Sequence, residues 1–216
     1  MKKQLLVRQL MVFLMLVSCS EGGRVTPLPT VDQSYYPLAM GDFREYSVME
    51  VSGRISAPDT SWYFLREQVE AVEAGAGEAS NYLISFAIRD NMNDDWDISG
   101  RMIARADASE VVEVLENNPI VKVRFPAGNN RWDSNVYSAE NAEFYAAELI
   151  DVDSLQNAVL KVVISELPVN ALNEVDSRFE YYSAGIGLIS RDFVILDFQN
   201  DEGLVIKQNI IRYGNE

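Results

Sequence analysis

The sequence predicts an all-β domain, an antiparallel sheet of about ten strands that forms an incomplete or closed barrel, with a β-sandwich as the alternative. Three observations support this prediction. Apolar and polar residues alternate with a period of two along most of the chain. Clusters of Gly, Asn, Asp and Pro separate the alternating stretches, as turns do. Amphipathic helices of about 10 to 15 residues do not lie between those stretches, which argues against a parallel α/β fold.

Four stretches alternate cleanly and predict half-buried strands. In residues 81–90 (NYLISFAIRD), Tyr82, Ile84, Phe86 and Ile88 fall on one face. The other three stretches are 119–125 (PIVKVRF), 158–165 (AVLKVVIS) and 203–213 (GLVIKQNIIRY). Less regular strands are expected, in chain order, at 43–52, 61–72, 98–106, 110–116, 142–151, 178–184 and 188–198.

The strand at 119–125 illustrates what the alternation implies for charged residues. Val121 and Val123 alternate there with Lys122 and Arg124. The pattern places the two basic side chains on the face opposite the apolar one, which in a half-buried strand is the solvent face.

The N-terminus has the features of an export signal. A short basic start over 1–8 precedes an unbroken apolar run over 10–17 (LMVFLMLV). Eight helical residues span about 12 Å, far less than a hydrocarbon core of ~30 Å. The run is therefore interpreted as the core of a signal peptide over 1–18, and not as a membrane span.

The single cysteine directly follows this run. Leu16, Val17, Ser18 and Cys19 resemble the lipobox of bacterial lipoproteins. The resemblance implies a diacylglycerol thioether on Cys19, cleavage before it and acylation of the new amino group. The alternative is a secreted protein with an incidental cysteine. Two or three acyl chains give stable attachment where one is marginal, so Cys19 is expected to be the membrane anchor and not a nucleophile.

Residues 19–34 are rich in Gly, Ser, Thr and Pro and are expected to form a lipidated, flexible tether. A single antiparallel β domain is expected over 35–216. Ser20 after the cysteine is consistent with passage to the outer membrane under the familiar sorting rule. The expected location is the outer membrane, on its periplasmic face or at the cell surface.

Composition excludes several kinds of chemistry. The chain contains no histidine and one cysteine, which excludes Ser-His-Asp and Cys-His catalysis, histidine-ligated zinc, intramolecular disulfides and multi-thiolate metal sites. The net charge of −15 disfavours binding to nucleic acid. An enzyme would have to rely on carboxylates, Tyr, Lys and Ser, so we expect no catalytic activity and no cofactor.

Three stretches resemble a family of Bacteroidota lipoproteins. They are YYPLAMGDFREYSV at 35–48, FPAGNNRW at 125–132 and YYSAGIGLISRD at 181–192. The resemblance implies a β domain and an envelope location. Arg44 stands where the family pattern has Trp, so the resemblance does not predict how the first strand packs. Gly185 and Gly187 suit a bulge or bend where two strands meet.

One polar cluster is a candidate for calcium binding. Asn91, Asn93, Asp95 and Asp97 alternate within residues 90–100 (DNMNDDWDISG), as the oxygen ligands of a calcium loop do. Trp96 stands where such a loop needs Gly, however, and the expected Glu at the end is Met. A hairpin tip with solvated acids explains the cluster more simply.

Together these features predict a membrane-anchored lipoprotein with a non-catalytic binding or structural β domain on the extracytoplasmic side. The alternative is a carrier that holds a lipid or another apolar ligand in an open β-barrel. A protein, a glycan or an apolar molecule remains possible as the partner, with membrane contact through the lipid anchor. The alternation alone does not distinguish a filled barrel from an empty one.

Overall fold

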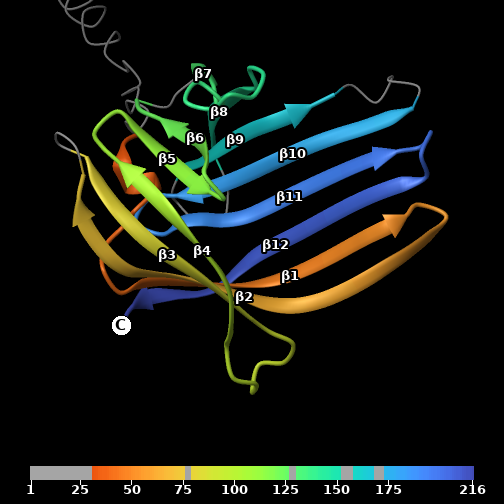
Figure 1. The fold of residues 1–216 in the computed structure, drawn as a ribbon, viewed down its shortest axis with the longest axis horizontal. Coiled ribbons are helices and arrows are strands. Elements are labelled where there is room, and N and C mark those ends of the chain that lie inside the picture. The colour runs from red at the N-terminus through yellow and green to blue at the C-terminus, as the bar shows by residue number, and fades with distance from the viewer. Residues whose placement is uncertain (1–30, 76–78, 127–129, 152–157, 168–172) are drawn as a thin grey trace, which may run out of the picture.

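The computed structural model describes residues 31–75, 79–126, 130–151, 158–167 and 173–216. A short 3₁₀ helix, η1 (Gln33–Tyr35), leads into a single antiparallel sheet (Figure 1). Its twelve strands are β1 (Asp42–Arg54), β2 (Ala57–Ala74), β3 (Ser80–Arg89), β4 (Asp97–Ala106), β5 (Glu110–Leu115), β6 (Asn118–Arg124), β7 (Asn130–Asp133), β8 (Phe144–Asp151), β9 (Ala158–Glu166), β10 (Glu174–Ser183), β11 (Gly187–Asp197) and β12 (Glu202–Asn215).

The strands follow one another in an up-and-down order. Neighbours in the sheet run β6-β5-β4-β3-β2-β1-β12-β11-β10-β9-β8-β7, so β1 pairs with β12 and all other pairs are consecutive in the chain. The two edges, β6 and β7, are themselves consecutive in the sequence. The sheet is therefore a barrel that is nearly closed, with one gap between these edges.

Two hydrogen bonds reach across this gap. The backbone N–H of Val121 donates to the carbonyl of Ser134 at 2.8 Å, and the indole Nε1–H of Trp132 donates to the carbonyl of Val121 at 2.9 Å. The Trp132 side chain is buried and packs edge-on against Tyr145. One backbone hydrogen bond and one tryptophan side chain thus take the place of a regular ladder between the two edges.

The fold class is as predicted, with two corrections. The sheet has twelve strands, not about ten, and β7, which is only four residues long and lacks an alternating pattern, matches none of the expected stretches. The β-sandwich alternative is wrong, because all described strands belong to one sheet. The eleven stretches expected from the sequence correspond to the other eleven strands.

The segment before β1 fills one end of the barrel. Val31, Tyr35 and Tyr36 are buried and belong to the main core cluster. Val31, which falls in the stretch expected to be a tether, is thus packed against the core. Gly41 has a φ of +85°, which a glycine adopts without strain, and turns the chain into β1.

The barrel has a covered half and an open half. In Figure 1, β3 to β6 cross in front of the long strands on one side only. The far ends of β10, β11, β12, β1 and β2 extend beyond them as a single layer, called here the wing. In the described residues, no helix has the length and apolar character that crossing a membrane requires.

Candidate functional site

The covered half of the barrel contains, within its apolar core, a network of charged residues that pair with one another. Lys122 of β6 contacts Glu180 of β10 at 2.8 Å, and Arg191 of β11 contacts the same carboxylate at 2.8 Å. Arg44 of β1 lies 3.4 Å from Glu67 of β2. The expectation that Lys122 faces solvent is therefore wrong. Its side chain points into the barrel, where the opposite wall supplies the carboxylate.

Three tyrosines complete this network, one for each carboxylate. The hydroxyl of Tyr182 donates to Glu180 at 2.7 Å, and that of Tyr46 donates to Glu67 at 3.1 Å. A third hydroxyl, on Tyr36 in the segment before β1, donates to Glu113 of β5. The cations of the network are Arg44, Lys122 and Arg191, and its anions are Glu67, Glu113 and Glu180.

The network contains three cations and three carboxylates, so its charges balance. These neighbouring charges, together with burial, determine the pKa values of Glu180, Tyr46 and Tyr182. Burial alone would raise the pKa of Glu180, but Lys122 and Arg191 outweigh it and lower that pKa to about 2. Burial, and then the neighbouring carboxylate, raise the pKa values of Tyr46 and Tyr182 well above the ordinary value. The carboxylate thus stays ionised at neutral pH and the tyrosines stay protonated donors, as the hydrogen bonds require.

Arg44 is accommodated by this arrangement, although a Trp was expected from the resemblance. Its guanidinium lies 5.9 Å from the ring centre of Tyr36 and pairs with Glu67. Gly187, the first residue of β11, leaves room for it: a Cβ at this position would collide with Nη1 of Arg44. Gly185 lies in the β10–β11 turn and Gly187 opens β11, both with a positive φ, so the two glycines stand at the predicted bend where two strands meet.

An apolar stripe continues from the network along the same inner face of the wing. Arg191 pairs in register with Gln208, Phe193 with Ile206, and Ile195 with Leu204. Side chains two residues apart on a strand share a face, so these apolar pairs lie on the network's side of the sheet. The apolar stripe, defined as Phe193, Ile195, Leu204 and Ile206, is only partly buried.

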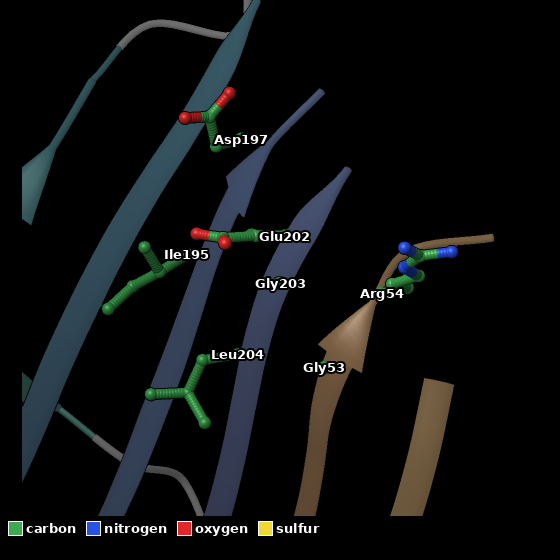
Figure 2. Close-up of a pocket in the computed structure, with 7 residues that line it drawn as sticks. All are labelled: Gly53, Arg54, Ile195, Asp197, Glu202, Gly203 and Leu204. Atoms are coloured by element: carbon green, nitrogen blue, oxygen red, sulfur yellow. The ribbon is translucent and has the colours of Figure 1, made fainter. Parts of the chain in front are cut away.

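The end of the apolar stripe is hollowed. Figure 2 shows the side chains of Ile195 and Leu204 close together, with the carboxylates of Asp197 and Glu202 nearer the strand ends. The hollow has a volume of about 450 Å³. Its lining residues are Gly53, Arg54, Ile195, Asp197, Glu202, Gly203 and Leu204.

Polar groups border the apolar stripe on both sides. On β10, Arg178 pairs with Asp176 through two contacts of 2.8 and 3.0 Å. On the other side, the hydroxyl of Tyr63 in β2 donates to Glu50 of β1 at 3.1 Å. Burial, and then Glu50, raise the pKa of Tyr63 to about 12. The inner face of the wing therefore combines an apolar floor with hydrogen-bonding groups along its margins.

The residues singled out by sequence fall outside this surface. Cys19 lies outside the described residues. Asn91, Asn93 and Asp95 are at the tip of the β3–β4 hairpin, and Asp97 begins β4. Asn91 is bonded through its side chain to Asp94 at 2.8 Å, as in a turn. Calcium binding at this tip stays a prediction.

The described residues form no cluster of three or more His, Cys, Asp or Glu side chains suited to a metal ion. Sequence reasoning also missed the apolar stripe, although a signal for it was present. Residues 193–196 (FVIL) and 204–206 (LVI) are continuously apolar, which is typical of strands covered on both faces.

Comparisons with known proteins yield one similar structure to report. No protein-family model matches the chain, and no curated protein matches it. A solved structure from Parabacteroides distasonis, described as a "putative lipoprotein", is 14% identical, with a TM-score of 0.46. The similar region covers 83% of this chain and 98% of that one.

Proposed function

We propose that this chain is a lipid-anchored, extracytoplasmic, non-catalytic binding domain. Its ligand carries an apolar group that lies along the apolar stripe and ends in the hollow beside Ile195 and Leu204. The anchor is the acylated Cys19, in an outer membrane with the domain on the periplasmic face or at the cell surface.

The observation that carries this proposal is the partial exposure of strands that are apolar on both faces. In a single-layer sheet, such strands leave apolar area in contact with water, at a cost of about 25 cal/mol per Å². A ligand that covers the inner face removes that cost. The hollow of about 450 Å³ is within the usual size range of small-ligand sites.

The charged network supports a structural role for the covered half. Each of its carboxylates has a cation and a tyrosine as partners, and its cations and anions balance. Groups that are paired in this way hold the two walls of the barrel together, which is a structural role.

The placement of the hollow suits an anchored domain. The described chain begins at Val31, beside η1, and β1 runs from that end to Arg54 at the hollow. Thirteen strand residues span roughly 40 Å at about 3.3 Å per residue. An anchor before Val31 would therefore attach the domain at the end opposite the binding surface (Figure 1).

The proposal is tested by titrating the full chain in detergent with N-phenylnaphthylamine, an apolar fluorescent probe. Leu204→Asp, on the stripe, is compared with Val205→Asp, its neighbour on the opposite face of β12. We expect probe binding by the wild type and by Val205→Asp, and loss of binding in Leu204→Asp. Equal binding by the two variants would reject the apolar stripe as the site.

A carrier of lipid is the second candidate, and the apolar floor of the hollow favours it. A carrier holds its cargo through purification, whereas a binding domain of a protein or glycan does not. Native mass spectrometry of the chain purified from its host separates the two. A discrete additional mass that matches a lipid, beyond the anchor itself, supports the carrier.

The anchor has its own test. Cys19→Ala should abolish incorporation of labelled fatty acid and release the protein from the membrane fraction. Label retained in that variant would contradict lipidation at Cys19.

A further inference from the structure

The outer face of the barrel carries a cluster of three arginines around one carboxylate. Glu45 of β1 pairs in register with Arg66 of β2 on one side and with Arg212 of β12 on the other. Arg89 reaches the same carboxylate from β3. Glu45 directly precedes the inward-facing Tyr46, so this arginine cluster lies on the face opposite the charged network.

The arginines surround Glu45 without closing hydrogen bonds to it. The N–O distances are 3.7 Å from Arg66, 3.9 Å from Arg89 and 3.7 Å from Arg212, beyond the usual hydrogen-bond range of about 2.7 to 3.2 Å. Among the described residues, the Nε–H groups of Arg66 and Arg89 are buried without a hydrogen-bond partner. The cluster therefore contains guanidinium N–H donors that no acceptor among the described residues satisfies.

Aromatic rings hold the guanidinium groups in place. Arg66 and Arg212 lie over Phe43, at 4.6 and 5.1 Å from its ring centre. Arg89 lies 4.1 Å from the ring centre of Trp96. Stacking of this kind fixes the orientation of a guanidinium before any ligand arrives, which lowers the entropic cost of binding.

The charge of the cluster contrasts with that of the chain. Three arginines face two carboxylates, Glu45 and Glu216, in a protein of net charge −15. Glu216 contacts Arg66 at 2.5 Å, but its side chain is 48% exposed and comes from beyond the last strand. This carboxylate occupies the place that an external anion would take, and it is free to be displaced into solvent.

We propose that the arginine cluster of Arg66, Arg89 and Arg212 binds a phosphate group, which displaces the Glu216 carboxylate. A phosphate monoester carries up to two negative charges and three acceptor oxygens, so it can accept from several guanidinium groups at once. The phosphate belongs either to a free phosphomonoester or to a phospholipid headgroup. This site lies on the opposite face of the sheet from the apolar stripe and does not depend on the proposed function.

The test is calorimetric titration of the full chain in detergent with sodium phosphate, against sodium chloride at matched ionic strength. Arg212→Gln removes the most exposed member of the cluster. Arg131→Gln is the matched control, because Arg131 is also exposed and also lies over an aromatic ring, at 4.6 Å from the centre of Phe144. Glu216→Gln removes the competing carboxylate.

We expect phosphate binding that is about tenfold weaker in Arg212→Gln, unchanged in Arg131→Gln and stronger in Glu216→Gln. Equal binding in all variants, or no effect of phosphate beyond that of chloride, would overturn the proposal.

A second titration, with glycerol 3-phosphate and with monomeric dihexanoyl phosphatidic acid, distinguishes the two sources. Equal binding of the two compounds assigns the site to the phosphate group alone, and preference for the lipid assigns it to a headgroup. Failure of both compounds to bind contradicts the site.

Discussion

Trp132 donates its indole hydrogen to the backbone carbonyl of Val121 at 2.9 Å, across the gap between the two edges of the sheet. Edge strands expose unpaired backbone groups, and a barrel avoids this by closing on itself. Here the sheet turns back toward its own start, and the buried Trp132 side chain joins β6 to β7 together with the backbone hydrogen bond from Val121 to Ser134. Closure of the barrel therefore depends in part on a residue in its shortest strand.

Replacing Trp132 with Phe should weaken that closure. The variant keeps an aromatic ring in the core but leaves the buried Val121 carbonyl without the indole donor. We expect a loss of about 1 to 3 kcal/mol in the free energy of unfolding, measured by urea denaturation. Trp62→Phe is the control, because Trp62 is 66% exposed, and it should change stability by less than about 0.5 kcal/mol. Similar losses in both variants would contradict a special role for Trp132.

Lys122→Met should be among the most destabilising single changes. It leaves Glu113 without its cation and Glu180 with Arg191 alone, in the buried interior. Removing one partner of a buried ion pair costs about 3 to 5 kcal/mol. Lys207→Met breaks an exposed pair with Asp192 and should cost no more than about 1 kcal/mol. Comparable unfolding free energies for the two variants would show that Lys122 is not buried in an ion pair.

Acid should destabilise the fold through Glu180. Its pKa is about 2 in the folded protein against 4.5 as the ordinary value, so its contribution is complete above pH 4.5. As the pH falls through the folded pKa, the carboxylate is protonated and that contribution is lost. The unfolding free energy, measured from pH 5 to pH 2, should decrease over this window, and Glu180→Gln should flatten the decrease. An equal decrease in the variant would assign acid sensitivity to other groups.

Gly187 and Gly185 should respond differently to alanine. Both have a positive φ, of +91° and +75°, so each substitution pays a backbone cost of about 1 to 2 kcal/mol. At Gly187 the new methyl group also collides with Arg44, whereas at Gly185 it meets open space. Thermal unfolding should therefore show a clearly larger decrease in Tm for Gly187→Ala. Equal decreases would mean that Arg44 moves aside freely.

Much of the fold could be predicted from local pattern. A strand with one buried face alternates with period two, and eleven strands showed that pattern or a weaker form of it. The strand β7 could not be found in this way, because four residues are too few to establish a period. The role of β7 in closing the barrel depends on the contact of Trp132 with Val121 of β6, and local sequence does not reveal such a tertiary contact.

The charged network could not be predicted from the alternation of apolar and polar residues. Alternation separates the two faces of a strand but does not say which face is buried when both carry large side chains. Lys122 and Glu180 come from opposite walls of the barrel, so neither strand alone indicates that its charge is paired. The apolar run at 193–196 did contain usable information, because a strand apolar on both faces indicates cover on both faces.

The central claim is that the apolar stripe on the inner face of the wing binds an apolar group. Methyl-labelled NMR of the protein, titrated with N-phenylnaphthylamine, tests it residue by residue. The account predicts that the methyl signals of Ile195, Leu204 and Ile206 shift, while those of Val194 and Val205 on the opposite face do not. Shifts on the opposite face, with the stripe unchanged, would contradict it.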